Sequence, residues 1–139
     1  MSPQQEVFTH CLVLAKGLGT AYDYIPDDGA AFPFFYIGEQ FSLDQANKTA
    51  VFGQVNQTIH LFHNDRRRRG DLSKLMEDFI QSLREDKETR SYYIHILQVN
   101  QQVIYERVGK ESMLHGIIEA RIHFQYKGGR NNVRSNERD

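Results

Sequence analysis

Two stretches of the chain space their apolar residues three or four positions apart, as one face of an α-helix requires. The first stretch begins after Ser2 and Pro3, which suit the cap and first turn of a helix, and it is ended by Gly17 or Gly19. The second stretch follows Gly70. We therefore predict two amphipathic helices. Their apolar positions are Val7, Phe8, Cys11, Leu12, Ala15 and Leu18 in the first, and Leu72, Leu75, Met76, Phe79, Ile80 and Leu83 in the second.

Two segments rich in aromatic and β-branched residues, 34–41 and 51–62, have the composition of β-strands. The polar residues 42–50 between them show no periodicity, so we expect them to form a long hairpin loop. Residues 21–25 can add a short strand ahead of a loop marked by proline and glycine.

A strict alternation of apolar and polar residues marks the last predicted strand, residues 113–126. Ahead of it, residues 91–99 and 101–108 are separated around Asn100 and predict a β-hairpin. The alternation gives the sheet one apolar face and one polar face. In the last strand Ile118, Ala120, Ile122 and Phe124 alternate with Glu119, Arg121, His123 and Gln125.

The order of helix, strands, helix and strands predicts an α+β fold, with an antiparallel or mixed β-sheet of four to five strands and two α-helices packed on one face. A chain of 139 residues has the size of one domain, which we expect residues 1–126 to form. Residues 127–139 carry four cations, two carboxylates and one aliphatic side chain. This basic tail has too little apolar surface to order itself, so we expect it to be disordered in the free protein.

Charge and hydropathy narrow the class of protein further. A formal net charge of −1 gives no overall attraction to nucleic acid or to anionic lipid. No apolar run approaches the roughly 18 residues of a membrane span, and the first residues lack the pattern of a signal peptide. We therefore expect a soluble protein, made in the cytoplasm, that does not contact membranes. The single cysteine, Cys11, falls on the apolar face of the first predicted helix, which predicts a buried and inert thiol.

Six histidines raise the question of a metal site. His60 and His63 lie three apart and would point to opposite faces of a strand, so both cannot bind one ion there. The others on later strands, His95, His115 and His123, fit a polar sheet face. The chain also lacks a nucleophile elbow and a phosphate-binding glycine loop. We predict no catalytic residue, no metal and no cofactor, and hence not an enzyme; a small hydrolase would need a pocket with perturbed carboxylates or histidines.

The sharpest local feature is a run of four cations, Arg66, Arg67, Arg68 and Arg69, just before the second predicted helix. Cations at a helix N-terminus oppose its dipole, so helix stability gives no reason for them. Asp71 is expected to be the compensating cap. The run can bind DNA phosphates, meet an acidic surface of a neighbouring subunit, or remain solvated, and the sequence leaves these alternatives open.

Four segments resemble the tail-terminator, or tail-completion, family of long-tailed bacteriophages. They are AYDYIPDDGAAFPFFYIGEQF, NQTIHLFHND, RGDLSKLMEDFIQSL and HGIIEARIHFQY. The most specific piece is the proline-led strand PFFYIGEQ, preceded by the Tyr22, Asp23 and Pro26 of a short YD-x-x-P segment. A His-Gly pair, His115 and Gly116, precedes the terminal strand.

This resemblance implies an α+β subunit without a cofactor or a reaction, which assembles with itself as a sixfold ring on the last tier of the tail tube. Its partners would be the tail-tube protein and the head connector or head-closure protein. Its place would be the tail–head interface of the virion, after assembly in the host cytoplasm. The hairpin loop of the family lies where subunits and tube meet, which makes Asp44, Gln45, Asn47 and Lys48 candidate assembly residues. The arginine run and the basic tail depart from the family pattern.

Two other readings stay open. Another neck component, such as a head-closure or connector-adaptor protein, has a similar size and a similar α+β content. A nucleic-acid-binding accessory protein would instead use the arginine run and the basic tail for non-specific contact with phage DNA, and its affinity would fall steeply with salt.

Overall fold

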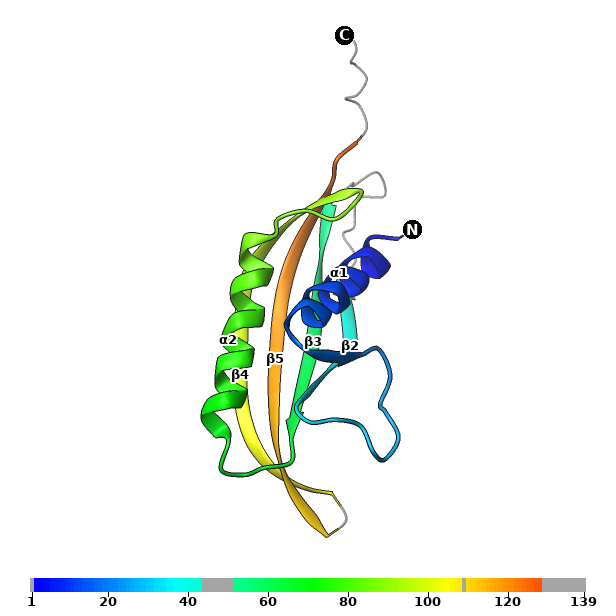
Figure 1. Ribbon diagram of the computed structural model, residues 1–139. Helices are drawn as coiled ribbons and strands as arrows, with labels where there is room; N and C mark the ends of the chain where they lie inside the picture. The colour runs from blue at the N-terminus through cyan, green and yellow to red at the C-terminus, as the bar shows by residue number, and fades with distance from the viewer. Residues whose placement is uncertain (1, 44–51, 109, 129–139) are drawn as a thin grey trace.

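The computed structural model describes residues 2–43, 52–108 and 110–128, which form one sheet with two helices (Figure 1). The five strands lie in the order β1-β2-β3-β5-β4. β1 runs parallel to β2 and the other pairs are antiparallel, so the sheet is mixed and the predicted α+β fold is confirmed. The elements are α1 (Pro3–Leu18), β1 (Thr20–Tyr22), β2 (Phe34–Leu43), β3 (Phe52–His63), α2 (Arg69–Glu85), β4 (Tyr92–Val108) and β5 (Glu111–Tyr126).

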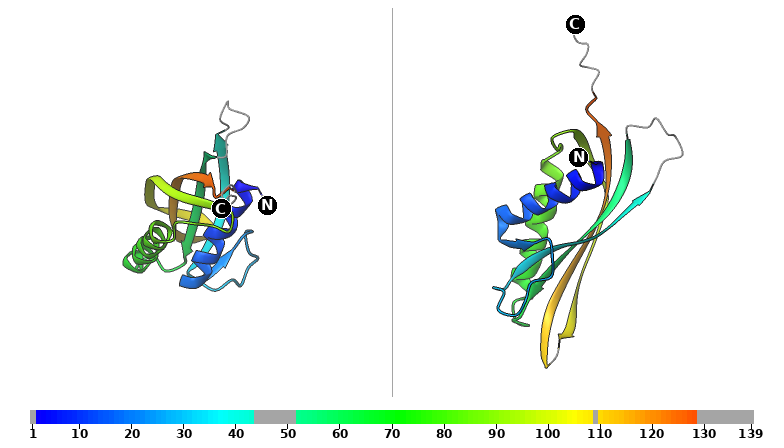
Figure 2. Two further views of the ribbon diagram at one scale, coloured as in Figure 1. Left: turned by 90° about the horizontal axis from the view of Figure 1, so that it is seen from above. Right: turned by 90° about the vertical axis from the view of Figure 1, so that its right-hand side faces the viewer.

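Both helices cover the same face of the sheet, and among the described residues the opposite face carries no helix (Figure 2, right). α1 packs over β1 and β2, whereas α2 packs over β3, β4 and β5. Phe79 of α2 meets Phe35 of β2 at the centre of this layer, with 5.8 Å between the ring centroids. The predicted apolar alternation of β5 is confirmed, since Ile118, Ala120, Ile122 and Phe124 are all buried. We call the uncovered side the open face.

The ends of α1 follow the sequence signals. The Ser2 Oγ accepts the backbone N–H of Gln5 at 3.1 Å, and Pro3 occupies the first turn. The helix ends at Leu18, where the N–H of Gly19 donates to the carbonyl of Ala15. The predicted burial of Cys11 is also confirmed, and burial raises the pKa of its thiol to about 12.

The prediction that Asp71 caps the second helix is wrong. α2 begins at Arg69, and the cap residue Arg68 makes no side-chain capping bond. Asp71 lies within the first turn of the helix, where its carboxylate accepts a hydrogen bond from Arg68 Nη1 at 3.3 Å. The carboxylate that closes the turn before the helix is Asp65, which accepts the backbone N–H of Arg67 at 3.0 Å.

The predicted hairpin around Asn100 is wrong as well. β4 is a single strand from Tyr92 to Val108 that pairs with β5 along its length, with Asn100 opposite Glu119. A lone asparagine without a glycine is a weak turn signal, and the long alternating strand β5 offers backbone partners to both predicted halves. The only irregularity in this pairing is a register shift between Ile96 and Gln98.

Glu6 on α1 is a buried carboxylate that lies outside the apolar positions predicted for the first helix. It accepts hydrogen bonds from the Thr89 Oγ1 at 2.7 Å and from the Ser91 N–H at 2.9 Å, and so ties α1 to the segment that enters β4. Burial by itself would raise the pKa of Glu6, but these hydrogen bonds outweigh it and the pKa is lowered. Across the described residues, neither helix has the length and apolar character needed to cross a membrane.

Candidate functional site

Four side chains form a line across the open face, one from each of the four long strands. Glu39 of β2 lies 2.7 Å from His60 of β3, measured from Oε1 to Nε2. The other nitrogen of His60, Nδ1, lies 2.7 Å from Nε2 of His115 on β5. The remaining nitrogen of His115, Nδ1, lies 3.1 Å from Oε1 of Glu106 on β4. We call these four residues the histidine row.

A β-bulge in β2 aims Glu39 at the row. Tyr36 and Ile37 pair regularly with β3, but Gly38 and Glu39 then face one partner before regular pairing resumes at Gln40. The extra residue turns Glu39 to the open face, where regular alternation would have pointed it at the core. Gly38 keeps the approach open, since a Cβ there would lie 2.8 Å from the imidazole carbon Cδ2 of His60.

The bulge in turn depends on Gln57, a fully buried amide of β3. Its Nε2 donates to the backbone carbonyls of Gly38 at 3.1 Å and of Thr58 at 3.1 Å, with a longer contact to that of Glu39. Its Oε1 accepts a hydrogen bond from Gln40 Nε2 at 2.9 Å. A buried amide with these partners satisfies carbonyl groups that the bulge removes from the strand ladder.

The histidine row forms an unbroken hydrogen-bond chain only when its two imidazole rings hold three protons together. Each outer ring nitrogen must donate, because an ionised carboxylate has no proton to give. A third proton must lie between His60 and His115, since two bare lone pairs would repel each other at 2.7 Å. In that state the two rings share one positive charge, held between the carboxylates of Glu39 and Glu106.

Burial and stacking set the surroundings of the two rings. Burial lowers the pKa of His115 by more than its hydrogen bond to Glu106 raises it. The hydrogen bond from His60 holds the pKa of Glu39 below its ordinary range. The neutral form of the imidazole is therefore favoured at His115. Phe62 stacks on His115 at 4.4 Å between ring centroids, and Tyr36 stacks on His60 at 5.5 Å, so both rings are shielded from water.

The lowered pKa of His115 predicts a loss of stability in mild acid. The unfolded chain takes up a proton on this imidazole below about pH 6.5, whereas the folded chain resists it to a lower pH. The contribution of His115 is thus complete above about pH 6.5 and is lost as the pH falls through the lowered value. We expect the free energy of unfolding, measured by urea titration, to fall less between pH 7 and pH 5 in His115→Gln than in the wild type.

His95→Gln is the matched control for this prediction, because it removes an exposed imidazole from the same face. Equal slopes of stability against pH in the two variants would contradict the assignment of His115. The carboxylates Glu6 and Glu39, whose pKa values are lowered, add to acid sensitivity only below about pH 4.5, so they do not confound this window.

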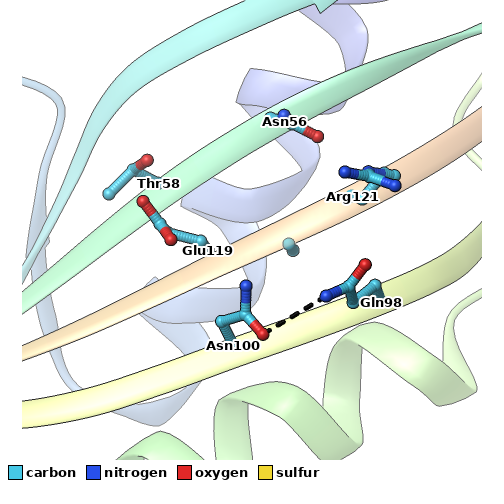
Figure 3. A pocket seen from close by; sticks show the side chains of 7 residues that line it. Asn56, Thr58, Gln98, Asn100, Glu119 and Arg121 are labelled. Atoms are coloured by element: carbon cyan, nitrogen blue, oxygen red, sulfur yellow. Dashed lines mark hydrogen bonds between the residues drawn. The ribbon is translucent and has the colours of Figure 1, made fainter.

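A second region of the open face is a polar hollow of about 220 Å³. Its side chains stand in two rows across β3, β5 and β4, and Gln98 donates a hydrogen bond to Asn100 at 3.4 Å (Figure 3). The carboxylate of Glu119 and the guanidinium of Arg121 come from β5, the middle one of these three strands. The labelled lining residues are Asn56, Thr58, Gln98, Asn100, Glu119 and Arg121.

A third region is a wider pocket of about 680 Å³ at the end of the open face near the loop between β1 and β2. Its aromatic side chains are Phe32, Phe34 and Phe62. Among the described residues that line it, every charged one is acidic; these are Asp27, Asp28, Glu106 and Glu111. We call it the acid-rimmed pocket. Glu106 belongs both to this pocket and to the histidine row.

The arginine run, Arg66, Arg67, Arg68 and Arg69, lies in the turn before α2 and is exposed throughout. Arg67 pairs with Asp65 at 3.1 Å, and Arg68 pairs with Asp65 at 3.7 Å and with Asp71 at 3.3 Å. The structure does not bring the run to the histidine row. The candidate assembly residues Asp44, Gln45, Asn47 and Lys48 lie outside the described residues, as does the basic tail beyond Gly128.

Sequence reasoning placed His60 and His115 on the polar sheet face but missed that they touch each other. It also missed Glu39, Glu106 and Gln57. The sequence did carry one indication of the contact between His60 and His115, since both fall on polar positions of predicted strands. The register of β3 against β5 and the bulge in β2 were not readable from the pattern. Within the described part of the chain, no three side chains of His, Cys, Asp and Glu converge where they could hold a metal ion.

The fold defines the class of protein as a two-helix, five-stranded α+β subunit. No family model matches the chain, and no curated protein sequence matches it. Among solved structures, a chain from the virion of a native gene transfer agent (GTA) particle has a similar fold, with a TM-score of 0.61 and 18% sequence identity. The match covers 91% of this chain and 96% of that chain. At 18% identity this similarity shows a shared fold and no more.

Proposed function

We propose that this chain is a structural subunit of a phage-like virion and, more specifically, a tail terminator. In this role it is not an enzyme and needs no cofactor. It forms a ring, a hexamer, on the end of the tail tube, stops the growth of the tube and joins the tail to the head. Its partners are further copies of itself, the tail-tube protein and the head connector or head-closure protein.

The observation that carries this proposal is the fold likeness to a virion chain over almost the full length of both chains. The match covers 91% of this chain and 96% of that chain, so the likeness extends over nearly the whole of the shared fold. The four segments that resemble tail terminators favour this role over the other roles of virion proteins. The strand segment PFFYIGEQ among them holds Glu39 and the bulge that aims it at the histidine row.

The open face supports a role in assembly. It combines a polar hollow, an acid-rimmed pocket and exposed aromatic residues such as Phe52 and Tyr93, which are 45% and 53% exposed. A ring buries such surfaces through contacts between unlike sides of neighbouring subunits. The hairpin-loop residues Asp44, Gln45, Asn47 and Lys48 stay candidates for contact with the tube.

Removing the protein from the assembling particle tests the role. If the chain terminates tails, electron microscopy of particles assembled without it will show over-long tails that are not attached to heads. Supplying the wild-type chain in trans must restore normal length. Tails of normal length on heads that leak their DNA would contradict termination and indicate a head-closure protein instead.

A further inference from the structure

We propose that the acid-rimmed pocket binds the arginine run of a second copy of this chain, and that this contact joins neighbouring subunits. The inference rests on the proposed ring and deepens it, because it names the two surfaces that meet. The pocket is lined by Asp27, Asp28, Glu106 and Glu111 around Phe32, Phe34 and Phe62.

The lining of the pocket suits a guanidinium group in particular. A guanidinium is planar, stacks on aromatic rings and donates hydrogen bonds to carboxylates in pairs, whereas an ammonium is a compact, strongly hydrated charge. Phe34 and Phe62 supply ring surface, with their centroids 5.4 Å apart, and the carboxylates lie around them. The chemistry of the pocket is therefore that of an arginine receptor.

The chain itself carries the complementary group. Arg66, Arg67, Arg68 and Arg69 are all exposed, and only Asp65 and Asp71 offset them locally, which leaves a formal charge of about +2 on a short turn. Among the described residues, none of the four pairs with a carboxylate of the pocket in the same subunit. The helix dipole of α2 disfavours these cations, so helix stability does not account for their presence. A contact between subunits does.

The two surfaces are distinct but neighbouring, since Asn64, two residues before Arg66, also lines the pocket. The loop between β1 and β2, which carries Asp27 and Asp28, projects to the right in Figure 1. The turn that leads from β3 into α2 lies at the lower left of the same view. Because the pocket and the arginine run are unlike surfaces, a contact between them is heterologous, and such contacts can repeat from one subunit to the next around a closed ring.

Charge reversal and complementation test the contact. The reversed-run variant is R66E/R67E/R68E/R69E, and the reversed-pocket variant is D27K/D28K/E111K, which leaves Glu106 in the histidine row. Both sets of residues are exposed. A control, E77K/E85K/D86K, changes three exposed carboxylates away from the open face by the same total charge as the reversed-pocket variant. Circular dichroism establishes that each variant is folded before association is compared.

Sedimentation at low salt and at concentrations up to about 1 mM, the dissociation constant of a very weak contact, measures association. We expect the wild type and the control to associate, and the association to weaken as salt screens the charges. Each reversed variant alone should sediment as a monomer, and an equimolar mixture of the two should regain association, because glutamates of one then face lysines of the other.

A wild-type chain that stays monomeric throughout this range would overturn the proposal, as would a reversed variant that associates like the wild type, or a mixture that does not recover. Loss of DNA retention by the reversed-run variant with unchanged self-association would also overturn it and assign the run to nucleic acid. The tail-length experiment is independent of all these outcomes, so failure of this contact can be distinguished from failure of the terminator role.

Discussion

Phe79→Ala should lower the free energy of unfolding by roughly 3–5 kcal/mol, a large part of the stability of a domain of this size. Phe79 is fully buried at the centre of α2, where its ring packs on Phe35 of β2. The substitution removes apolar contact with the sheet and leaves a cavity that the neighbouring strands can fill only in part. Urea-induced unfolding followed by circular dichroism measures the change.

Glu77→Ala is the control for this substitution, because Glu77 is exposed on the same helix and alanine is a good helix former. Its effect should stay within about 0.5 kcal/mol. A Phe79→Ala variant that unfolds at the same urea concentration as this control would show that the apolar stripe of α2 does not hold the two layers together.

Gln57→Leu should be the second severe change, with an expected loss of about 2–5 kcal/mol from leaving two or more buried polar groups without partners. The amide of Gln57 serves the carbonyls of Gly38 and Thr58 and accepts from Gln40, and leucine can do none of this. The bulge should then relax and move Glu39 away from His60. Urea unfolding measures the stability, and ¹⁵N NMR of the imidazole nitrogens reports on the contact between Glu39 and His60.

Gln102→Leu makes the same chemical change at an exposed position of β4 and should alter stability by about 0.5 kcal/mol or less. If Gln57→Leu is no more harmful than Gln102→Leu, the buried amide is not what holds the bulge. If stability falls but the His60 signals are unchanged, the bulge holds Glu39 without help from Gln57.

The local pattern of the sequence determined the helices and the face of the sheet that they cover. Ser2, Pro3 and Gly19 act at the ends of α1 as their chemistry predicts, since caps depend on neighbouring backbone groups only. The alternation along β5 likewise gave the buried positions of the longest predicted strand. Signals of this kind work because the groups that interact lie within a few residues of each other.

Local pattern failed where a distant partner decides the structure. Asn100 sits inside a strand because β5 supplies partners along its whole length, and Glu6 is buried because Thr89 and Ser91 come to it from far along the chain. In both cases tertiary contacts outweigh the preference of the single residue.

The histidine row is likewise decided by contacts between distant segments of the chain. Its four residues come from four strands, and their meeting requires the register of β3 against β5 together with a bulge that shifts β2 by one residue. A shift of one residue sends every later side chain of a strand to the other face, so no pattern along β2 alone could place Glu39 beside His60. By itself the sequence determined the two faces of the regularly alternating strand β5, but only the tertiary structure decided which side chains touch on the open face, because strand register is set by packing between segments and not within them.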